Sequence, residues 1–263
     1  MKNTTLPILL ASMLLATQVW AIPVLQVGAP GGPGEGIYAN YIPDGVNPVE
    51  TNTAFTSGST LFVAGVYGSN TTSLGGQSTG VDWGGVDAAY SIFNGRGAIL
   101  LAAVPNGYLT MALPPVLTVN GSTAFYSSAT LDGLFPNNHD PLKNGVSDFL
   151  FFEIGNFVKI LNAVPNFDSE TGAADGQIKT LTLGGAALTA LPWIHFDVLA
   201  LGTDSKNSKI VTTIENNPGS KDVTWKTGNG GGTPPLSVPE PGVVLLMGAG
   251  LVGLGLARRR KPA

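Results

Sequence analysis

The sequence predicts an all-β protein, an antiparallel β-sandwich of the jelly-roll type followed by a single C-terminal transmembrane helix. Charged residues make up 11% of the chain, well below the roughly 25% usual in globular proteins, and its 36 glycines are about twice the usual share. Both features disfavour long helices with charged faces. Short β-branched and aromatic runs separated by Gly, Asn, Asp and Pro are typical of sandwich strands and their turns.

The predicted strands share this composition. They cover residues 60–67, 98–104, 116–119, 149–160, 178–183, 193–201, 209–215 and 222–226. Within residues 193–198, apolar side chains alternate with His195 and Asp197, which places these two polar side chains together on one face. The alternation predicts a strand with one buried and one solvated face.

The N-terminal residues predict a secretory signal peptide. Lys2 supplies a positive charge, residues 6–16 form an apolar core, and small residues precede a cleavage point after Ala21. An uncleaved anchor is the alternative, but this core is too short to span a bilayer comfortably. We therefore expect signal peptidase to remove residues 1–21.

The rest of the chain divides into a body and a tail. Residues 22–226 are expected to form one β-sandwich body, and the Gly- and Pro-rich residues 227–237 are expected to form a linker. Setting aside the first 21 and the last 26 residues leaves eight Lys and Arg against sixteen Asp and Glu, a net charge of about −8. Nucleic acid is therefore not an expected partner, because binding it requires a basic patch.

The tail, residues 238–263, contains three parts in order: a Pro-Glu-Pro triplet, an uncharged apolar run at residues 242–257 and a basic end at residues 258–263. The prolines keep the backbone extended, the apolar run predicts a transmembrane helix, and the cations hold the end of the chain on the cytoplasmic side. The body is therefore expected outside the cell. The residues predicted to form the signal are Pro239, Glu240, Pro241, Arg258, Arg259 and Arg260.

This order of triplet, apolar helix and Arg cluster resembles the PEP-CTERM sorting signal of Gram-negative bacteria that make exopolysaccharide. The resemblance implies recognition by an exosortase, a membrane-embedded cysteine protease or transpeptidase that cuts near the triplet and discards the helix. It also implies transient anchoring in the inner membrane. The final location would be the cell surface or the extracellular space, in association with exopolysaccharide or biofilm.

The body is similar to the choice-of-anchor group of exported bacterial domains. The resemblance lies in residues 22–26, in the His139-Asp140-Pro141 triplet ahead of the aromatic run at 149–152, and in residues 194–198. Such families are defined by their exported architecture, so the resemblance implies no catalytic residues.

Two patterns that would suit an enzyme do not lead us to expect catalysis. Residues 76–80 fit G-x-S-x-G, with Ser78 in the nucleophile position, but the surrounding Ser, Thr, Asn and Gly predict a polar loop rather than a strand-to-helix elbow. His139 and His195 each lie near an aspartate and would suit zinc. Because nothing in the sequence brings these histidines together, solvent-facing or capping roles are expected for both.

Asn166, Asp168 and Glu170 offer oxygen atoms at alternate positions, as a calcium loop does. Thr171 and Gln177 stand where the EF-hand pattern needs Gly and Glu, so an ordinary acidic turn is expected. No cofactor is predicted, and a structural calcium at these three residues is kept as the alternative.

The sequence therefore predicts a noncatalytic exported protein that is processed by signal peptidase and exosortase. One alternative is a carbohydrate- or calcium-binding module, which would present aromatic side chains on a flat sheet face or carboxylates around an ion. The other alternative is a secreted hydrolase, which would place Ser78 or a histidine in a concave pocket beside an oriented base.

Overall fold

The computed structural model describes residues 22–45, 50–76, 92–131, 133–135 and 139–226. Strands dominate these residues, and helical elements are short, such as the 3-10 helix η2 (Tyr108–Thr110) and the helix α1 (Ala187–Ala190). The predicted β class is confirmed.

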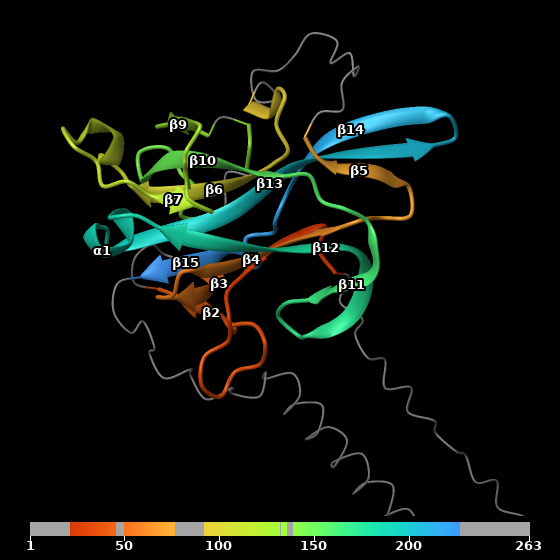
Figure 1. Ribbon diagram of the computed structural model, residues 1–263, viewed down its shortest axis with the longest axis horizontal. Coiled ribbons are helices and arrows are strands. Elements are labelled where there is room, and N and C mark those ends of the chain that lie inside the picture. The colour runs from red at the N-terminus through yellow and green to blue at the C-terminus, as the bar shows by residue number, and fades with distance from the viewer. Residues whose placement is uncertain (1–21, 46–49, 77–91, 132, 136–138, 227–263) are drawn as a thin grey trace, which may run out of the picture.

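Within the described residues the strands form a six-stranded and a nine-stranded sheet in two layers (Figure 1). The six-stranded sheet has the order β1 (Leu25–Gly28), β4 (Thr60–Val66), β12 (Thr171–Gly184), β7 (Thr118–Val119) and β8 (Ser122–Thr123), with β11 (Ile160–Asn166) also paired to β12. The nine-stranded sheet has the order β2 (Tyr41–Asp44), β3 (Glu50–Thr56), β15 (Val223–Lys226), β13 (Trp193–Lys206), β6 (Ala98–Pro105), β10 (Ser147–Gly155) and β9 (Tyr126–Ser128), with β14 (Lys209–Asn216) and β5 (Thr71–Gly75) also paired to β13.

The strand pairs are antiparallel except for β15 and β3, which run parallel with Val223 opposite Ala54. This pair corrects the prediction of a purely antiparallel sandwich. The parallel contact is possible because β3 and β15 are far apart in the sequence and need no tight turn between them. The two-layer β architecture is confirmed, and the jelly-roll strand order stays a prediction.

The strands differ from the predicted ones where tertiary pairing outweighs local sequence. The polar residues before Ser78, which were expected to form a loop, contain β5. This strand pairs with β13, and a hydrogen bond from the Thr71 hydroxyl to Asp204 Oδ1 (2.8 Å) joins the two strands. The predicted strand at 149–160 is two strands, because β10 ends at Gly155 after a bulge and β11 begins at Ile160.

The main hydrophobic core lies between the two sheets. It contains apolar residues of β1, β4 and β12 together with alternate residues of β6, β10 and β13. From the nine-stranded sheet these are Ala98, Leu100, Ala102, Val104, Leu150, Phe152, Ile194, Phe196, Val198 and Ala200.

A second hydrophobic cluster covers the opposite, outer face of the nine-stranded sheet. The intervening residues of β6, β10 and β13 pack there against residues from loops, among them Leu131, Leu134 and Leu142. These three belong to the connection between β9 and β10, which we call the covering segment (residues 129–146, of which 129–131, 133–135 and 139–146 are described). The prediction that β13 has one solvated face is wrong, since both of its faces are buried from Trp193 to Leu201.

The predicted signal peptide, linker and transmembrane helix lie outside the described residues. Among the residues that are described, no helix is long and apolar enough to cross a membrane.

Candidate functional site: a buried cluster of histidine and aspartate

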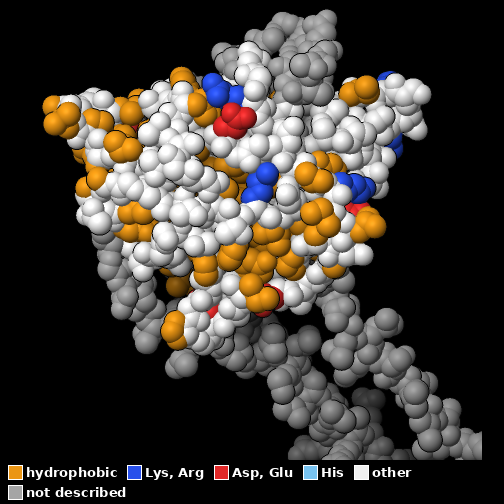
Figure 2. Space-filling model, viewed as in Figure 1, with side chains coloured by type: hydrophobic (Ala, Val, Ile, Leu, Met, Phe, Trp, Pro, Cys, Tyr) orange, Lys and Arg blue, Asp and Glu red, His pale blue; other side chains and the backbone are white. Residues whose placement is uncertain are grey.

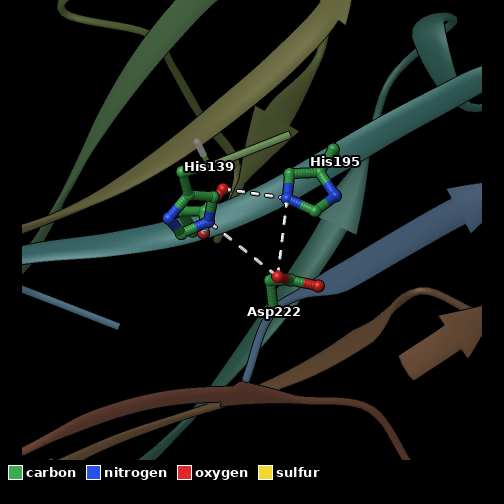
Figure 3. Close-up of side chains that lie close together, drawn as sticks. His139, His195 and Asp222 are labelled. Atoms are coloured by element: carbon green, nitrogen blue, oxygen red, sulfur yellow. Dashed lines mark ion pairs between the residues drawn. The ribbon is translucent and has the colours of Figure 1, made fainter. Parts of the chain in front are cut away.

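Four side chains from three separate parts of the chain meet on the outer face of the nine-stranded sheet. We call them the His–Asp cluster: His139, His195, Asp197 and Asp222. Each offers one nitrogen or oxygen atom, and these atoms all lie within 4.8 Å of one another. Figure 3 shows the imidazoles of His139 and His195 close to each other, with Asp222 facing both.

Three parts of the chain contribute these side chains: strand β13, the residue before β15 and the covering segment. His195 and Asp197 lie two residues apart on β13, so both point to the outer face of the sheet. Asp222 directly precedes β15, which pairs with β13 in a register that sets Thr224 opposite His195. His139 comes from the covering segment.

The distances within the cluster are short. Nε2 of His139 lies 2.9 Å from Oδ1 of Asp197, and Nε2 of His195 lies 3.0 Å from Oδ2 of the same carboxylate. Oδ2 of Asp222 lies 3.9 Å from the first of these nitrogens and 4.0 Å from the second. Both imidazoles therefore direct the same ring nitrogen toward the two carboxylates.

A surrounding layer of hydrogen bonds orients the cluster. Nδ1 of His195 lies 3.0 Å from the Thr224 hydroxyl, which lies 3.0 Å from the Thr53 hydroxyl. The Asn217 side chain accepts a hydrogen bond from Val198 N–H (2.8 Å) through Oδ1 and donates one to Asp197 Oδ1 (2.8 Å) through Nδ2. Because the backbone donor fixes which way this amide faces, its N–H group must point at the carboxylate.

Burial of the cluster is nearly complete. His139 is 4% exposed, and His195, Asp197 and Asp222 are 0% exposed. Burial alone would raise the pKa of Asp197, but the neighbouring His139 and His195 hold it well below its usual value of 3.8. Burial likewise opposes protonation of His139, yet the Asp197 carboxylate raises the pKa of that imidazole above 6.5.

The expectation of solvent-facing or capping histidines is therefore wrong. The sequence contained part of the signal, because the alternation on β13 placed His195 and Asp197 on one face. The contributions of His139 and Asp222 depend on the covering segment and on the pairing of β15 with β13, which no local pattern encodes.

The predicted calcium candidates have other partners. Asn166 Oδ1 accepts a hydrogen bond from Asp168 N–H, and the Asp168 carboxylate pairs with Lys221 Nζ at 3.0 Å. Oε1 of Glu170 accepts a hydrogen bond from Tyr38 N–H (3.0 Å). The Asn166 side chain thus bonds within the β11–β12 turn, while Asp168 and Glu170 tie that turn to neighbouring segments.

A pocket of about 390 Å³ opens near the β7–β8 hairpin and contains none of the cluster residues. Arg96 and Glu153 form an ion pair of 3.6 Å in its wall, and the Arg96 guanidinium lies 3.8 Å from the centre of the Phe125 ring. The Arg96 side chain is thus held by an acidic and an aromatic neighbour within this wall.

The remaining predicted site residues lie outside the described part of the chain: Ser78, Ala21, Pro239, Glu240, Pro241, Arg258, Arg259 and Arg260. Comparison with curated proteins and with solved structures finds no match. A comparison with family models does find one, at residues 237–261, and its description is the PEP-CTERM protein-sorting motif. The family match does not extend to the body, so its similarity to choice-of-anchor domains stays a prediction. The match confirms the predicted sorting signal: residues 237–261 are similar to the PEP-CTERM protein-sorting motif.

Proposed function

We propose that the chain is a noncatalytic protein of the cell surface or extracellular matrix, which an exosortase releases from its membrane-bound precursor. The sorting motif at residues 237–261 is the observation that carries this proposal. In this function signal peptidase removes residues 1–21, the inner membrane holds the precursor transiently through residues 242–257, and the β-rich body becomes part of a polysaccharide matrix.

The surface of the body supports a matrix role. In the view of Figure 2, charged side chains are few and scattered among uncharged groups. The exposed large hydrophobic side chains include Leu113, Leu161 and Ile210, at 91%, 75% and 70% exposure. A surface with few charged side chains suits contact with neutral polymer better than contact with a strongly charged ligand.

Two observations favour a noncatalytic body over the two alternatives. Among the exposed large hydrophobic residues of the described part of the chain, Tyr126 is the single aromatic one, whereas a carbohydrate-binding face would present several. The two histidines are buried at 4% and 0% exposure, so neither meets a polymeric substrate from solvent.

Fractionation of the native host tests the matrix role. Wild-type cells, an exosortase deletion and a strain unable to make exopolysaccharide would be separated into membrane, matrix and culture medium, and an antibody to the body would locate the protein. The expected locations are the matrix in wild type, the membrane in the exosortase deletion, and the medium in the strain without polysaccharide. An unchanged distribution in the strain without polysaccharide would contradict the matrix role, and an unchanged distribution in the exosortase deletion would contradict the release step.

A further inference from the structure

We propose that the His–Asp cluster binds one divalent transition-metal ion, such as Zn²⁺. This ion would hold the covering segment against the nine-stranded sheet. The proposal adds a structural metal to a body for which the sorting motif implies none. It does not depend on where the protein is finally located.

The donor geometry matches a tetrahedral site. Tetrahedral ligands with bonds of about 2.0–2.1 Å lie roughly 3.3–3.4 Å apart. With Oδ2 of Asp197 and Oδ2 of Asp222 as the oxygen ligands, the nitrogen–oxygen distances of 3.0, 3.9 and 4.0 Å bracket that spacing, and one ligand atom from each of the four residues lies within 4.8 Å of the others. Small side-chain movements would therefore place two nitrogens and two oxygens around one ion.

The charges of the cluster also match a divalent ion. With neutral imidazoles, the carboxylates of Asp197 and Asp222 bring two negative charges to a place that is 0% exposed. Two carboxylates this close to each other repel, and burial away from water strengthens the repulsion. A divalent cation balances both carboxylates while His139 and His195 stay neutral, which is the form that ligates metal.

The surrounding hydrogen bonds are those that a metal site uses. The Thr224 hydroxyl accepts Nδ1–H of His195 in the tautomer that leaves Nε2 free to ligate, and the Thr53 hydroxyl lies beyond it. Asn217 donates to Oδ1 of Asp197, so the other carboxylate oxygen, Oδ2, is the one turned toward His195. The two proposed ligands on β13, His195 and Asp197, thus have a fixed orientation.

The donor types select the class of metal. Imidazole nitrogen suits zinc and other first-row transition metals, whereas calcium takes oxygen ligands alone. Four buried protein donors would complete the coordination shell, as in structural zinc sites, and leave no position for a substrate. The ion would therefore stabilise the fold rather than catalyse a reaction.

The location of the cluster gives the ion a structural role. The chain has no cysteine, so no disulfide can join the covering segment to the sheet. The ligands come from the covering segment, from β13 and from the turn before β15. A metal bond network among them would cross-link segments that are 56 and 83 residues apart, taking His139 with His195 and His139 with Asp222.

The test is metal analysis and thermal unfolding of the exported protein, purified from its host without chelators. We expect about one transition-metal ion per chain by elemental analysis. Treatment with a chelator should lower Tm by about 5–10 °C, and Zn²⁺ at a hundredfold excess over its Kd should restore it, whereas Ca²⁺ should not. Co²⁺ added to the metal-free protein should give the strong visible absorption of tetrahedral coordination.

Asp222→Asn is the test variant, because it removes one ligand charge with little change in volume. It should bind Zn²⁺ at least about tenfold more weakly than wild type. Asp175→Asn is the matched control, since this carboxylate lies on β12 and pairs with Lys159 at 3.5 Å, and its Zn²⁺ affinity should equal that of wild type.

Two results would overturn the proposal. One is a wild-type protein that binds neither Zn²⁺ nor Co²⁺ and whose Tm does not change when the chelator is added. The other is an Asp222→Asn variant that binds Zn²⁺ as tightly as wild type. If Asp222→Asn does not fold, the Co²⁺ spectrum of the wild type decides: tetrahedral bands support the site, and their absence refutes it.

Discussion

Asn217 is the residue on which the orientation of the His–Asp cluster depends most directly. Its amide joins the Val198 backbone to the Asp197 carboxylate inside a fully buried environment. Asn217→Ala would leave the buried Val198 N–H without its acceptor and would remove one hydrogen bond from the Asp197 carboxylate, which keeps its contact with His139. An orphaned buried donor costs about 1–3 kcal/mol and a lost hydrogen bond to a charged group costs a similar amount, so the free energy of unfolding should fall by about 2–4 kcal/mol in urea titrations.

The neighbouring Asn216 provides the control for that variant. Its side chain donates a longer hydrogen bond, 3.3 Å, to Leu134 O from a partly exposed position. Asn216→Ala should therefore cost less than about 1 kcal/mol. Equal losses of stability in the two alanine variants would show that Asn217 does not have the orienting role assigned to it.

Tyr41 makes the fold sensitive to alkaline pH. Burial raises its pKa well above 10.0, with further contributions from the charges of Asp222 and Asp168, and its hydroxyl donates a hydrogen bond to Val27 O (2.5 Å). The folded protein keeps the proton, while the unfolded chain releases it above pH 10. Stability is therefore fully present below pH 10 and is lost as the pH rises.

Tyr41→Phe should reduce this alkaline loss. Between pH 10 and 11 the free energy of unfolding of the wild type should fall by about 1 kcal/mol more than that of the variant, as measured by urea unfolding at each pH. The variant should be less stable at pH 8, because it lacks the hydrogen bond to Val27 O. Parallel pH profiles for the two proteins would contradict the assignment to Tyr41.

The residues of the cluster show what the sequence can reveal about a buried site. Alternation on one strand predicts that His195 and Asp197 share a face, and this much is confirmed. Alternation does not tell whether that face meets water, because the answer depends on the covering segment. A polar face in a sequence of low charge is thus compatible with a solvated surface and with a buried polar cluster.

Among the structural elements, the strands rich in apolar and β-branched residues are the ones that the sequence predicts best. The runs at 60–67, 98–104 and 193–201 are rich in apolar residues because β4, β6 and β13 each have paired strands on both sides. The strand β5 was missed because its Thr, Ser and Gly residues also suit a polar loop. Its extended conformation comes from pairing with β13 rather than from local propensity.

Gly65 shows how closely the connection between β10 and β11 approaches strand β4 of the six-stranded sheet. A Cβ atom at this position of β4 would lie 2.5–2.8 Å from three ring atoms of the buried Phe157. Gly65→Ala should therefore lower the free energy of unfolding by about 1–3 kcal/mol, as overpacking does. In Gly58→Ala the new methyl group would meet Thr56 Oγ1 at 3.4 Å, and the change should stay within about 0.5 kcal/mol. Equal stability of Gly65→Ala and wild type would refute this close packing.

In the tail, we expect different residues to control exosortase cleavage and retention in the membrane. Glu240→Ala should leave membrane insertion intact and slow exosortase processing, so that uncut precursor accumulates in the membrane fraction. Replacing Arg258, Arg259 and Arg260 by Ala should instead weaken retention before cleavage, because these cations stop translocation. The variant with the alanine substitutions should appear outside the membrane with its tail uncut.

Immunoblots of fractionated cells would measure both effects. Processing of Glu240→Ala at the wild-type rate and to the same product would mean that the triplet does not direct cleavage. The tail would then be a simple membrane anchor.

At the scale of the whole molecule, a chain without cysteine must obtain its stability from burial and, in our proposal, from one metal ion. The nine-stranded sheet buries both faces over its central strands, which gives the body two hydrophobic clusters. The class of fold could be predicted from composition and strand spacing, whereas the second cluster could not. Its covering residues come from loops, whose apolar side chains have no regular period.

The most direct test of the central claim is the intact mass of the protein from its native host, compared with that from an exosortase deletion. We predict a wild-type product that begins at Ile22 and lacks residues 242–257, together with a precursor in the deletion strain that begins at Ile22 and retains the tail. A mass corresponding to the full chain from Met1 to Ala263 in the wild type would contradict export and processing. An identical product in both strains would contradict the action of an exosortase.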